Sequence, residues 1–305
     1  MPIVKAAVVH LDAVQRLLQH ATYRYVDMGR EDLPGLLAQA AAVGEDHGVV
    51  WGFVGVHVEE RPPTLPASAP TRAYVRAVGL QRGRLPDADL PALLEVALAQ
   101  PNRAARQATD GPLQVICYGA DRWLGHALAS AGFVQIEAVQ FFELDRLNSR
   151  LAGLPPMRNG IKLFPAQAAH LPELALLDAA AFPPLWHFGA RDLIEMLMRC
   201  RMQIAWLDGR MAGYSALCPN SRDEIQLARL AVAPEFQGHG VGRALLADAV
   251  RHAASAYTLL VLNTQTTNVR SQKLYRGFGF RPTGIAVPVL ARTRRQPTPQ
   301  PQPKL

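Results

Sequence analysis

Apolar residues recur along the chain in two patterns that alternate with each other. Short apolar runs, such as residues 51–58 and 113–118, have the length of buried strands, whereas residues 90–99 repeat leucine and alanine at helical spacing. This alternation predicts an α/β fold with a mixed central sheet flanked by helices. Strands are expected at 23–26, 51–58, 73–78, 113–118, 134–144, 161–164, 227–232 and 257–262. Helices are expected at 9–22, 32–42, 90–99, 123–131, 174–182, 191–198 and 241–253.

One stretch, LARLAVAPEFQGHGVGRALL at 227–246, combines a strand, a glycine loop and a helix start. Its apolar run is stopped by Pro234, glycines follow at 238, 240 and 242, and the helical pattern begins at Val241. This order places unpaired backbone N–H groups at the positive end of a helix, which favours an anion site. Neither the P-loop nor the dinucleotide-binding spacing is present. By itself the stretch is also compatible with a simple chain reversal.

A second stretch, NVRSQKLYRGFGF at 268–280, follows the strand-like residues 257–262. Together the two stretches resemble the GNAT superfamily of acyl-CoA-dependent N-acetyltransferases. The family's phosphate loop, [QR]-x-x-G-x-[GA], is matched by Gln237, Gly240 and Gly242. Its later motif, N-x-x-[AS]-x-x-L-Y-x-x-x-G-F, is matched at Asn268, Ser271, Leu274, Tyr275, Gly279 and Phe280. The resemblance covers roughly residues 160–290.

The resemblance implies acetyl-CoA as co-substrate and no metal. Backbone amides of the glycine loop would hold the pyrophosphate, with His239 or Arg243 adding charge. Strand residues Leu230 and Val232 would offer backbone groups to the pantetheine arm. Asn268 would reach that arm from the other side, where the two central strands separate. The expected acetyl-CoA contacts are Leu230, Ala231, Val232, Gln237, Gly238, His239, Gly240, Val241, Gly242, Arg243, Asn268, Ser271 and Tyr275.

Acyl transfer to an amine also needs proton handling. The resemblance implies that Tyr275 is the general acid that protonates the departing thiolate; the alternative is a core tyrosine with local hydrogen bonds. Glu224 leads the central strand and is the candidate general base, although it would equally suit a solvated strand end. At the site where other family members hold a base on the neighbouring strand, this chain has Asn263.

The acceptor is expected near the aromatic cluster Trp186, His187 and Phe188, because the family places this region over the acceptor pocket. The alternative is a packed corner between two helices. We expect an N-acetyltransferase that moves an acetyl group to a primary amine by direct transfer in a ternary complex. Two alternatives stay open: an acyl-CoA sensor without turnover, and a peptide N-terminal acetyltransferase.

The first half of the chain repeats the order of the second half. WGFV at 51–54 matches AGYS at 212–215, Arg76 is aligned with Leu230, and LASAGF at 128–133 mirrors YRGFGF at 275–280. We therefore expect two tandem GNAT-like domains. The first copy has Leu128 at the position of Tyr275 and no counterpart of Asn268, so it is expected to be degenerate; a second acyl-CoA site is the alternative. Expected segments are a domain at 1–145, a linker at 146–160, a catalytic domain at 161–291 and a disordered basic tail at 292–305.

Charge and composition narrow the class of partner. The 305 residues carry a net charge of +7, but four basic residues and no acid lie in the last fourteen, which leaves 28 basic against 25 acidic groups elsewhere. This mildly basic body suits polyanionic coenzyme A and favours neither nucleic acid nor a membrane as partner. Cys117, Cys200 and Cys218 are expected to be reduced thiols of a cytoplasmic protein, either a monomer or a homodimer.

Overall fold

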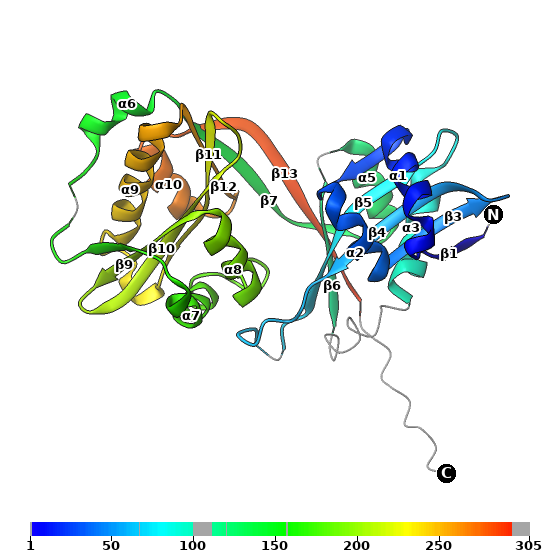
Figure 1. Cartoon of the computed structure of the whole chain (residues 1–305), viewed down its shortest axis with the longest axis horizontal. Coiled ribbons are helices and arrows are strands. Elements are labelled where there is room, and N and C mark those ends of the chain that lie inside the picture. The colour runs from blue at the N-terminus through cyan, green and yellow to red at the C-terminus, as the bar shows by residue number, and fades with distance from the viewer. Residues whose placement is uncertain (1, 67, 100–111, 120, 157, 295–305) are drawn as a thin grey trace, which may run out of the picture. The chain divides into compact units, whose positions relative to one another are not determined.

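The structure is a computed structural model that describes residues 2–66, 68–99, 112–119, 121–156 and 158–294. It divides into two compact units (Figure 1). Unit 1 contains Met1–Arg61, Ser68–Glu137 and Val287–Leu305, and unit 2 contains Pro62–Ala67 and Ala138–Ala286. Each unit has a mixed sheet flanked by helices, as the sequence predicts.

Unit 1 is built from the first half of the chain and one strand of the second. Its sheet has the order β1-β3-β4-β5-β6-β13, and β2 pairs with β5. Only β5 and β6 run parallel among the pairs that the structure describes here. Its elements are β1 (Ile3–Lys5), η1 (Val8–His10), α1 (Leu11–His20), β2 (Tyr23–Val26), η2 (Arg30–Asp32), α2 (Leu33–Ala38), β3 (Ala40–Asp46), β4 (Val49–Val58), β5 (Thr71–Leu80), α3 (Pro86–Ala99), β6 (Leu113–Tyr118) and α5 (Arg122–Ser130).

Unit 2 repeats this plan. Its sheet has the order β8-β9-β10-β11-β12-β7, with β11 and β12 parallel. Helix α9 covers one face of the sheet, and α7 and α8 cover the other (Figure 1). Its elements are α6 (Leu147–Arg150), η3 (Leu151–Gly153), β8 (Lys162–Pro165), η4 (Ala168–His170), α7 (Leu171–Ala181), α8 (Ala190–Arg199), β9 (Arg201–Leu207), β10 (Arg210–Pro219), β11 (Glu224–Val232), η5 (Pro234–Phe236), α9 (Val241–Ala256), β12 (Leu259–Gln265) and α10 (Val269–Gly277).

The two halves exchange their last strands. Strand β7 (Val134–Leu144) follows α5 in the chain, but from Ala138 onward it belongs to unit 2 and pairs with β12. Strand β13 (Arg281–Arg294) follows α10, but from Val287 onward it belongs to unit 1 and pairs with β6. Each sheet therefore includes a strand from the other half of the sequence. The domains expected from the sequence, at 1–145 and 161–291, do not include this exchange of strands.

Two expected segments have more structure than their composition indicated. Residues 146–160, expected as a linker, carry α6 and η3. Strand β13 runs to Arg294, so residues 292–294 of the expected tail are in a strand; residues 295–305 lie outside the described part of the chain. The expected helix at 32–42 is also too long, because α2 ends at Ala38 and β3 begins at Ala40.

The duplication is visible in backbone details that recur in both copies, meaning the first and second halves of the chain. A hairpin turn with two positive φ values falls at His47–Gly48 and again at Asp208–Gly209. A bulge in the next strand follows, where the register skips Trp51 in β4 and Ala212 in β10. The central strands carry a second bulge, which skips Arg76 in β5 and Ala228 in β11.

The second bulge corrects one alignment made from the sequence. Because Arg76 corresponds to the bulged Ala228, the counterpart of Leu230 is Val78 and not Arg76. The hairpin registers agree, since Gly52 pairs with Leu80 in the first copy and Gly213 pairs with Val232 in the second. The sequence alignment was wrong by two residues, because loop lengths between the motifs differ and a bulge is invisible in the apolar pattern.

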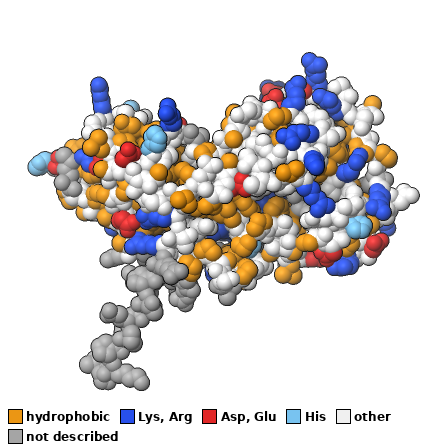
Figure 2. All heavy atoms as spheres, turned by 180° about the vertical axis from the view of Figure 1, so that it is seen from behind, with side chains coloured by type: hydrophobic (Ala, Val, Ile, Leu, Met, Phe, Trp, Pro, Cys, Tyr) orange, Lys and Arg blue, Asp and Glu red, His pale blue; other side chains and the backbone are white. Residues whose placement is uncertain are grey.

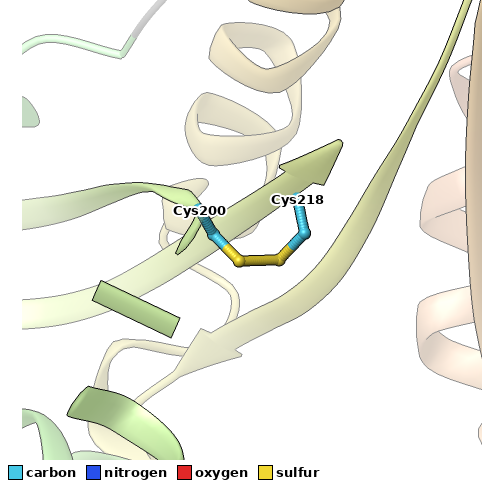
Figure 3. The surroundings of a disulfide bond; sticks show 2 residues. All are labelled: Cys200 and Cys218. Carbon is cyan, nitrogen blue, oxygen red and sulfur yellow. A yellow bond between two sulfur atoms is a disulfide. The ribbon is translucent and has the colours of Figure 1, made fainter. Parts of the chain in front are cut away.

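Two cysteines expected as free thiols form a disulfide. Cys200 and Cys218 are bonded, with a Cα–Cα distance of 4.3 Å (Figure 3). The bond follows from the hairpin register, because Arg201 at the start of β9 pairs with Leu217 of β10 and brings the adjoining cysteines together. Cys117 is a buried free thiol. The expectation of three reduced thiols was therefore wrong.

Candidate functional site

The central strands of unit 2 separate partway along their length. Parallel pairing of β11 with β12 ends at Leu227 and Leu262, although β11 continues to Val232 and β12 to Gln265. Their outer neighbours stay paired throughout, since Val232 still pairs with Gly213 of β10. The two strands thus expose facing backbone edges, which is the separation that the resemblance implied for the pantetheine arm.

The direction of the peptide groups decides which residues of β11 have backbone N–H and C=O groups facing this open edge. The amide of Ala233 donates to Ala212 of β10 at 3.0 Å, so its peptide groups point toward β10. Peptide direction alternates along a strand. Leu230 and Val232 therefore direct their backbone groups to the open edge, whereas Ala231 directs its own toward β10 and has a buried side chain.

The glycine loop lies directly after the open edge of β11. Gly238 and Gly240 have φ values of +86° and +89°, a region that disfavours side chains, and Gly240 is the N-cap of α9 without any side-chain cap. The first N–H groups of a helix have no partner within the helix, so the amides from Val241 to Arg243 are available to an anion. Gly242 has ordinary backbone geometry, and a Cβ there would make normal contacts, 3.5 Å from Leu274.

Basic residues lie along this loop. His239 and Arg243 are exposed, as are two arginines that also hold the loop. Arg158 donates to the backbone oxygen of His239 at 3.0 Å, and Arg270 donates to the side chain of Gln237. Gln237 in turn donates to the backbone oxygen of Val232 at 3.3 Å, which ties the loop to the end of β11. Figure 2 shows Lys and Arg side chains over unit 2, on the right in that view.

Helix α10 brings the later motif to the same end of the sheet. The side chain of Asn268 caps the helix, because its Oδ1 accepts from the amide of Ser271 at 3.1 Å. The ring of Tyr275 packs on Phe142 and Phe280, and the side chain of Ser271 influences its phenol. Burial raises the pKa of Tyr275 to about 12, and the Ser271 side chain and the charge of Arg229 oppose this rise. The phenol is therefore protonated at neutral pH.

A buried ion pair, which the sequence analysis missed, organises the expected acceptor wall. Arg229 of β11 contacts both carboxylate oxygens of Asp178 on α7, at 2.8 Å from Nε and 2.6 Å from Nη2. Asp178 is fully buried and also accepts from the hydroxyl of Tyr214 at 2.5 Å. The guanidinium lies between the rings of Phe182 and Phe188, 3.5 and 3.9 Å from their centroids.

Comparison with known proteins places these features in a family. Residues 171–280 match the model of the acetyltransferase (GNAT) family. This segment is a GNAT domain. Rat N-acetyltransferase 8B is 37% identical over 71 residues, which are 23% of this chain and 32% of the rat protein. A putative ribosomal protein bS18-alanine N-acetyltransferase of Bacillus subtilis is 33% identical over 79 residues, which are 26% of this chain and 52% of that protein. The chain thus spans a third to a half of these relatives.

Solved structures extend the likeness beyond the GNAT segment. A tandem GNAT protein from the clavulanic acid biosynthesis pathway superposes with a TM-score of 0.59 at 19% identity, covering 97% of this chain and 99% of that chain. A GCN5-related N-acetyltransferase from Sphaerobacter thermophilus gives 0.61 at 14% identity, covering 97% and 96%. At such identities the likeness concerns the fold: the chain is built of two tandem GNAT-like domains.

The expected acceptor wall, Trp186, His187 and Phe188, is held by the ion pair. Trp186 accepts from Nη2 of Arg229 through its backbone oxygen at 2.7 Å, and the amide of Phe188 donates to Asp178 at 2.6 Å. His187 between them is buried, with 1% of its surface exposed. The structure thus brings all three predicted wall residues together, at a loop anchored by side chains from α7 and β11.

Glu224 lies at the beginning of β11. Its Oε1 accepts from the side chain of Asn220 at 2.9 Å, which closes the turn from β10. The bulge at Ala228 shifts the alternation of β11, so Glu224 and Gln226 share a face with Arg229 although simple alternation would separate them. The candidate base and the ion pair therefore occupy the same side of the sheet.

Among the residues that the structure describes, no group of three or more His, Cys, Asp or Glu side chains is placed to hold a metal ion. Within the same residues, none of the helices is both long and apolar enough to cross a membrane.

Proposed function

We propose that the GNAT domain transfers an acetyl group from acetyl-CoA to a primary amine, directly and within a ternary complex. One observation carries the proposal: the open edge of β11 is followed, after η5 and the glycine loop, by the uncapped start of α9, and α10, which carries Tyr275, begins after the neighbouring strand β12. These parts match the three needs of the donor, which are a partner for its amides, a site for its phosphates and a proton donor for its sulfur.

In this proposal the donor binds along β11. The pyrophosphate takes the amides of the 238–243 loop, and the exposed cations around His239 and Arg243 add attraction. The backbone of Leu230 and Val232 pairs with the amides of the pantetheine arm. Asn268 uses Oδ1 to cap α10 and offers its amide nitrogen to the donor. Ser271 acts through Tyr275, whose phenol it influences electrostatically.

Starting from its ammonium form, the acceptor nitrogen loses two protons, one before attack and one as the amide forms, and the leaving sulfur gains one. The neutral amine nitrogen attacks the thioester carbonyl carbon, the carbon–sulfur bond breaks, and its electron pair stays on sulfur. A lysine-like ammonium with a pKa of about 10.4 is roughly one part in a thousand neutral at pH 7. Glu224, acting through water, is the proposed base for the first of these protons. Tyr275 donates its phenolic hydrogen to the leaving sulfur, and the second proton, released as the amide forms, restores the phenol. Holding both reactants side by side supplies much of the rate.

The acceptor is proposed to be a small amine or a peptide amine that meets the wall formed by Trp186, His187 and Phe188. The peptide alternative is favoured by the Bacillus relative, whose name specifies an alanine of a ribosomal protein. A sensor without turnover has no need of a protonated phenol beside the sulfur site, so Tyr275 favours an enzyme over a sensor. No metal takes part in the proposed reaction.

Location and assembly are also proposals. A monomer or homodimer in the cytoplasm was expected from the sequence. The Cys200–Cys218 disulfide weighs against a strongly reducing compartment, since such bonds persist mainly in oxidising ones. Trapping thiols in intact cells before lysis decides this point: alkylation of both cysteines would support the cytoplasm, and protection of both would contradict it.

The reaction is tested by incubating the full chain with acetyl-CoA and a panel of small amines and peptides, then following free thiol and acetylated product together. We expect amine-dependent thiol release with one acetylated amine per thiol. Initial rates at varied concentrations of both substrates should give intersecting double-reciprocal lines. Parallel lines would contradict direct transfer, and thiol release that never depends on an amine would contradict the transferase.

A further inference from the structure

The two copies differ in one segment that lies between matched landmarks. Before it, the amides of Ala7 and Gln167 donate to Nδ1 of His10 and His170, at 2.9 and 3.0 Å. After it, the amides of Gly29 and Gly189 donate to Asp32 and Asp192, at 3.0 and 2.7 Å. The same number of residues separates these landmarks in both copies. Tyr23–Val26 of the first copy therefore corresponds to residues 183–186 of the second.

In the first copy this segment fills the separation between the central strands. Parallel pairing of β5 with β6 ends at Tyr74 and Ile116. Beyond that point β2 pairs with β5 instead, from Tyr23 opposite Leu80 to Val26 opposite Ala77. Strand β2 thus occupies the edge of Val78 and Leu80, the counterparts of Leu230 and Val232. The edge that would receive a pantetheine arm is already paired within the chain.

In the second copy the corresponding segment stays away from the edge. It forms a turn, with the amide of Trp186 donating to the oxygen of Pro183 at 2.8 Å. Within the described residues, β11 pairs only with β10 and β12. The turn is held at its end by Arg229, which binds the oxygen of Trp186, and by Asp178, which binds the amide of Phe188.

Sequence chemistry gives this difference two causes. Pro183 and Pro184 replace Tyr23 and Arg24, and proline has no N–H to donate. Because inward-facing amides alternate along a strand, one of two consecutive prolines must fall at a ladder position. The turn segment therefore cannot form the full antiparallel ladder that β2 forms.

The second cause is the buried ion pair. Asp178, Arg229 and Tyr214 are buried, at 0, 8 and 0% exposure. Counted from the first residue of α1 and α7, Asp178 corresponds to Leu18; by the strand bulges, Arg229 corresponds to Ala77 and Tyr214 to Phe53. These three counterparts pack in one apolar cluster of unit 1.

The first copy, with apolar residues at these three positions, shows whether the fold needs the ion pair of the second copy. Replacing a buried ion pair by apolar residues is often neutral or stabilising, because burial removes both charges from water. The same fold exists in unit 1 without the pair, so the fold does not require it. Its presence in the second copy then calls for another reason, and its contacts to Trp186 and Phe188 supply one.

We propose that the Asp178–Arg229 pair, together with Pro183 and Pro184, keeps residues 183–186 away from the open edge of β11. The space beside Leu230 and Val232 in which the pantetheine arm would bind, called here the donor slot, is thereby kept open. Arg229 and Asp178 are positioning residues for donor binding. The role of the slot rests on the proposed function. The same reasoning makes unit 1 a copy whose donor slot is closed by its own strand β2, so the chain offers one acyl-CoA site.

The test transplants the first copy's residues into the second: Asp178→Leu, Pro183→Tyr, Pro184→Arg, Tyr214→Phe and Arg229→Ala in one variant. This apolar set already packs in unit 1, which favours folding. Amide hydrogen exchange should slow at Leu230 and Val232 as the segment pairs with β11. The Kd for coenzyme A, measured by calorimetry, should rise at least tenfold.

A single substitution provides a second test in case the fivefold variant does not fold. Arg229→Lys keeps the charge but loses the two-pronged contact, so coenzyme A should bind several-fold more weakly with the fold intact. The matched control removes another ion pair of unit 2, Arg201 with Asp248 at 2.6 Å, by a double alanine substitution. That control should leave coenzyme A affinity and exchange at Leu230 unchanged.

The outcomes separate the two proposals. Wild-type protein that binds no coenzyme A would overturn the proposed function, and the exchange measurement would still decide the role of the ion pair because it needs no ligand. Folded variants in which Leu230 and Val232 exchange as fast as in wild type would overturn the inference. Unchanged coenzyme A affinity in both Arg229 variants would do the same.

Discussion

Leu128 and Tyr275 occupy the same position in the two copies. The amide of Phe133 donates to the oxygen of Leu128 at 2.9 Å, and the amide of Phe280 donates to the oxygen of Tyr275 at 3.1 Å. A glycine with positive φ precedes each phenylalanine. The helix ends are thus built alike, and the difference lies in the side chain, which is apolar in one copy and a phenol in the other.

Replacing Tyr275 by Phe tests the phenol without disturbing the packing. The ring keeps its contacts with Phe142 and Phe280, so coenzyme A affinity should be unchanged. The turnover number should fall about 10²–10⁴-fold, the usual contribution of a general acid or base. Steady-state kinetics with saturating acetyl-CoA measures this, and Tyr257→Phe in the same unit is the control. A turnover loss below about threefold at every pH would reject the role.

The pH dependence follows from the direction of the Tyr275 shift. Since its pKa is raised to about 12, the phenol keeps its proton well above neutral pH, and no alkaline loss of turnover from this group is expected below about pH 11. The same pKa shift should appear in the pH dependence of the free energy of unfolding. The unfolded phenol ionises first, so wild type should lose unfolding free energy relative to Tyr275→Phe as pH rises from 10 toward 12. Parallel stability curves for both proteins would contradict this.

Glu224→Gln tests the candidate base. The amide keeps an acceptor for Asn220 and so preserves the turn at the start of β11. Turnover should fall at least about tenfold while coenzyme A affinity stays the same, because only proton removal from the amine is lost. Glu195→Gln on α8 serves as control for a carboxylate elsewhere in the unit. Wild-type turnover in Glu224→Gln would leave Glu224 as a turn-closing residue only.

The disulfide gives a prediction about stability. Alkylating the denatured protein without reductant should label Cys117 alone, because Cys200 and Cys218 are bonded. Reduction should lower the free energy of unfolding by about 3 kcal/mol, as expected for a short closed loop. Denaturant titration with and without reductant measures this loss. Labelling of three thiols in the unreduced sample would contradict the bond.

Local chemistry could be predicted from the sequence. The glycine loop and the start of α9 follow from residues that favour one backbone conformation, such as Gly240, and from an apolar pattern with helical period. The cap at Asn268 and the position of Tyr275 follow from one short motif. Such features depend on neighbours in sequence, so a linear pattern contains them.

Features that depend on register could not be predicted in this way. The bulge at Ala228 turns Arg229 to the face of Glu224, and apolar alternation gives no sign of it. The Asp178–Arg229 pair joins a helix to a distant strand, and each residue alone looks like an ordinary charged position. Cys200 and Cys218 meet only because β9 and β10 pair, and those strands were not predicted.

The central claim, one acyl-CoA site per chain at the start of α9, is tested most directly by calorimetric titration of wild type, Gly242→Asp and Gly242→Asn with coenzyme A. Gly242 tolerates a side chain, since a Cβ there would lie 3.5 Å from Leu274 and 3.6 Å from Val232. The two variants match in size, and only Asp places a negative charge beside the amides that receive the pyrophosphate. We predict one coenzyme A per wild-type chain and at least tenfold weaker binding to Gly242→Asp than to Gly242→Asn. Two coenzyme A molecules per chain, or equal affinities of the two variants, would contradict the account.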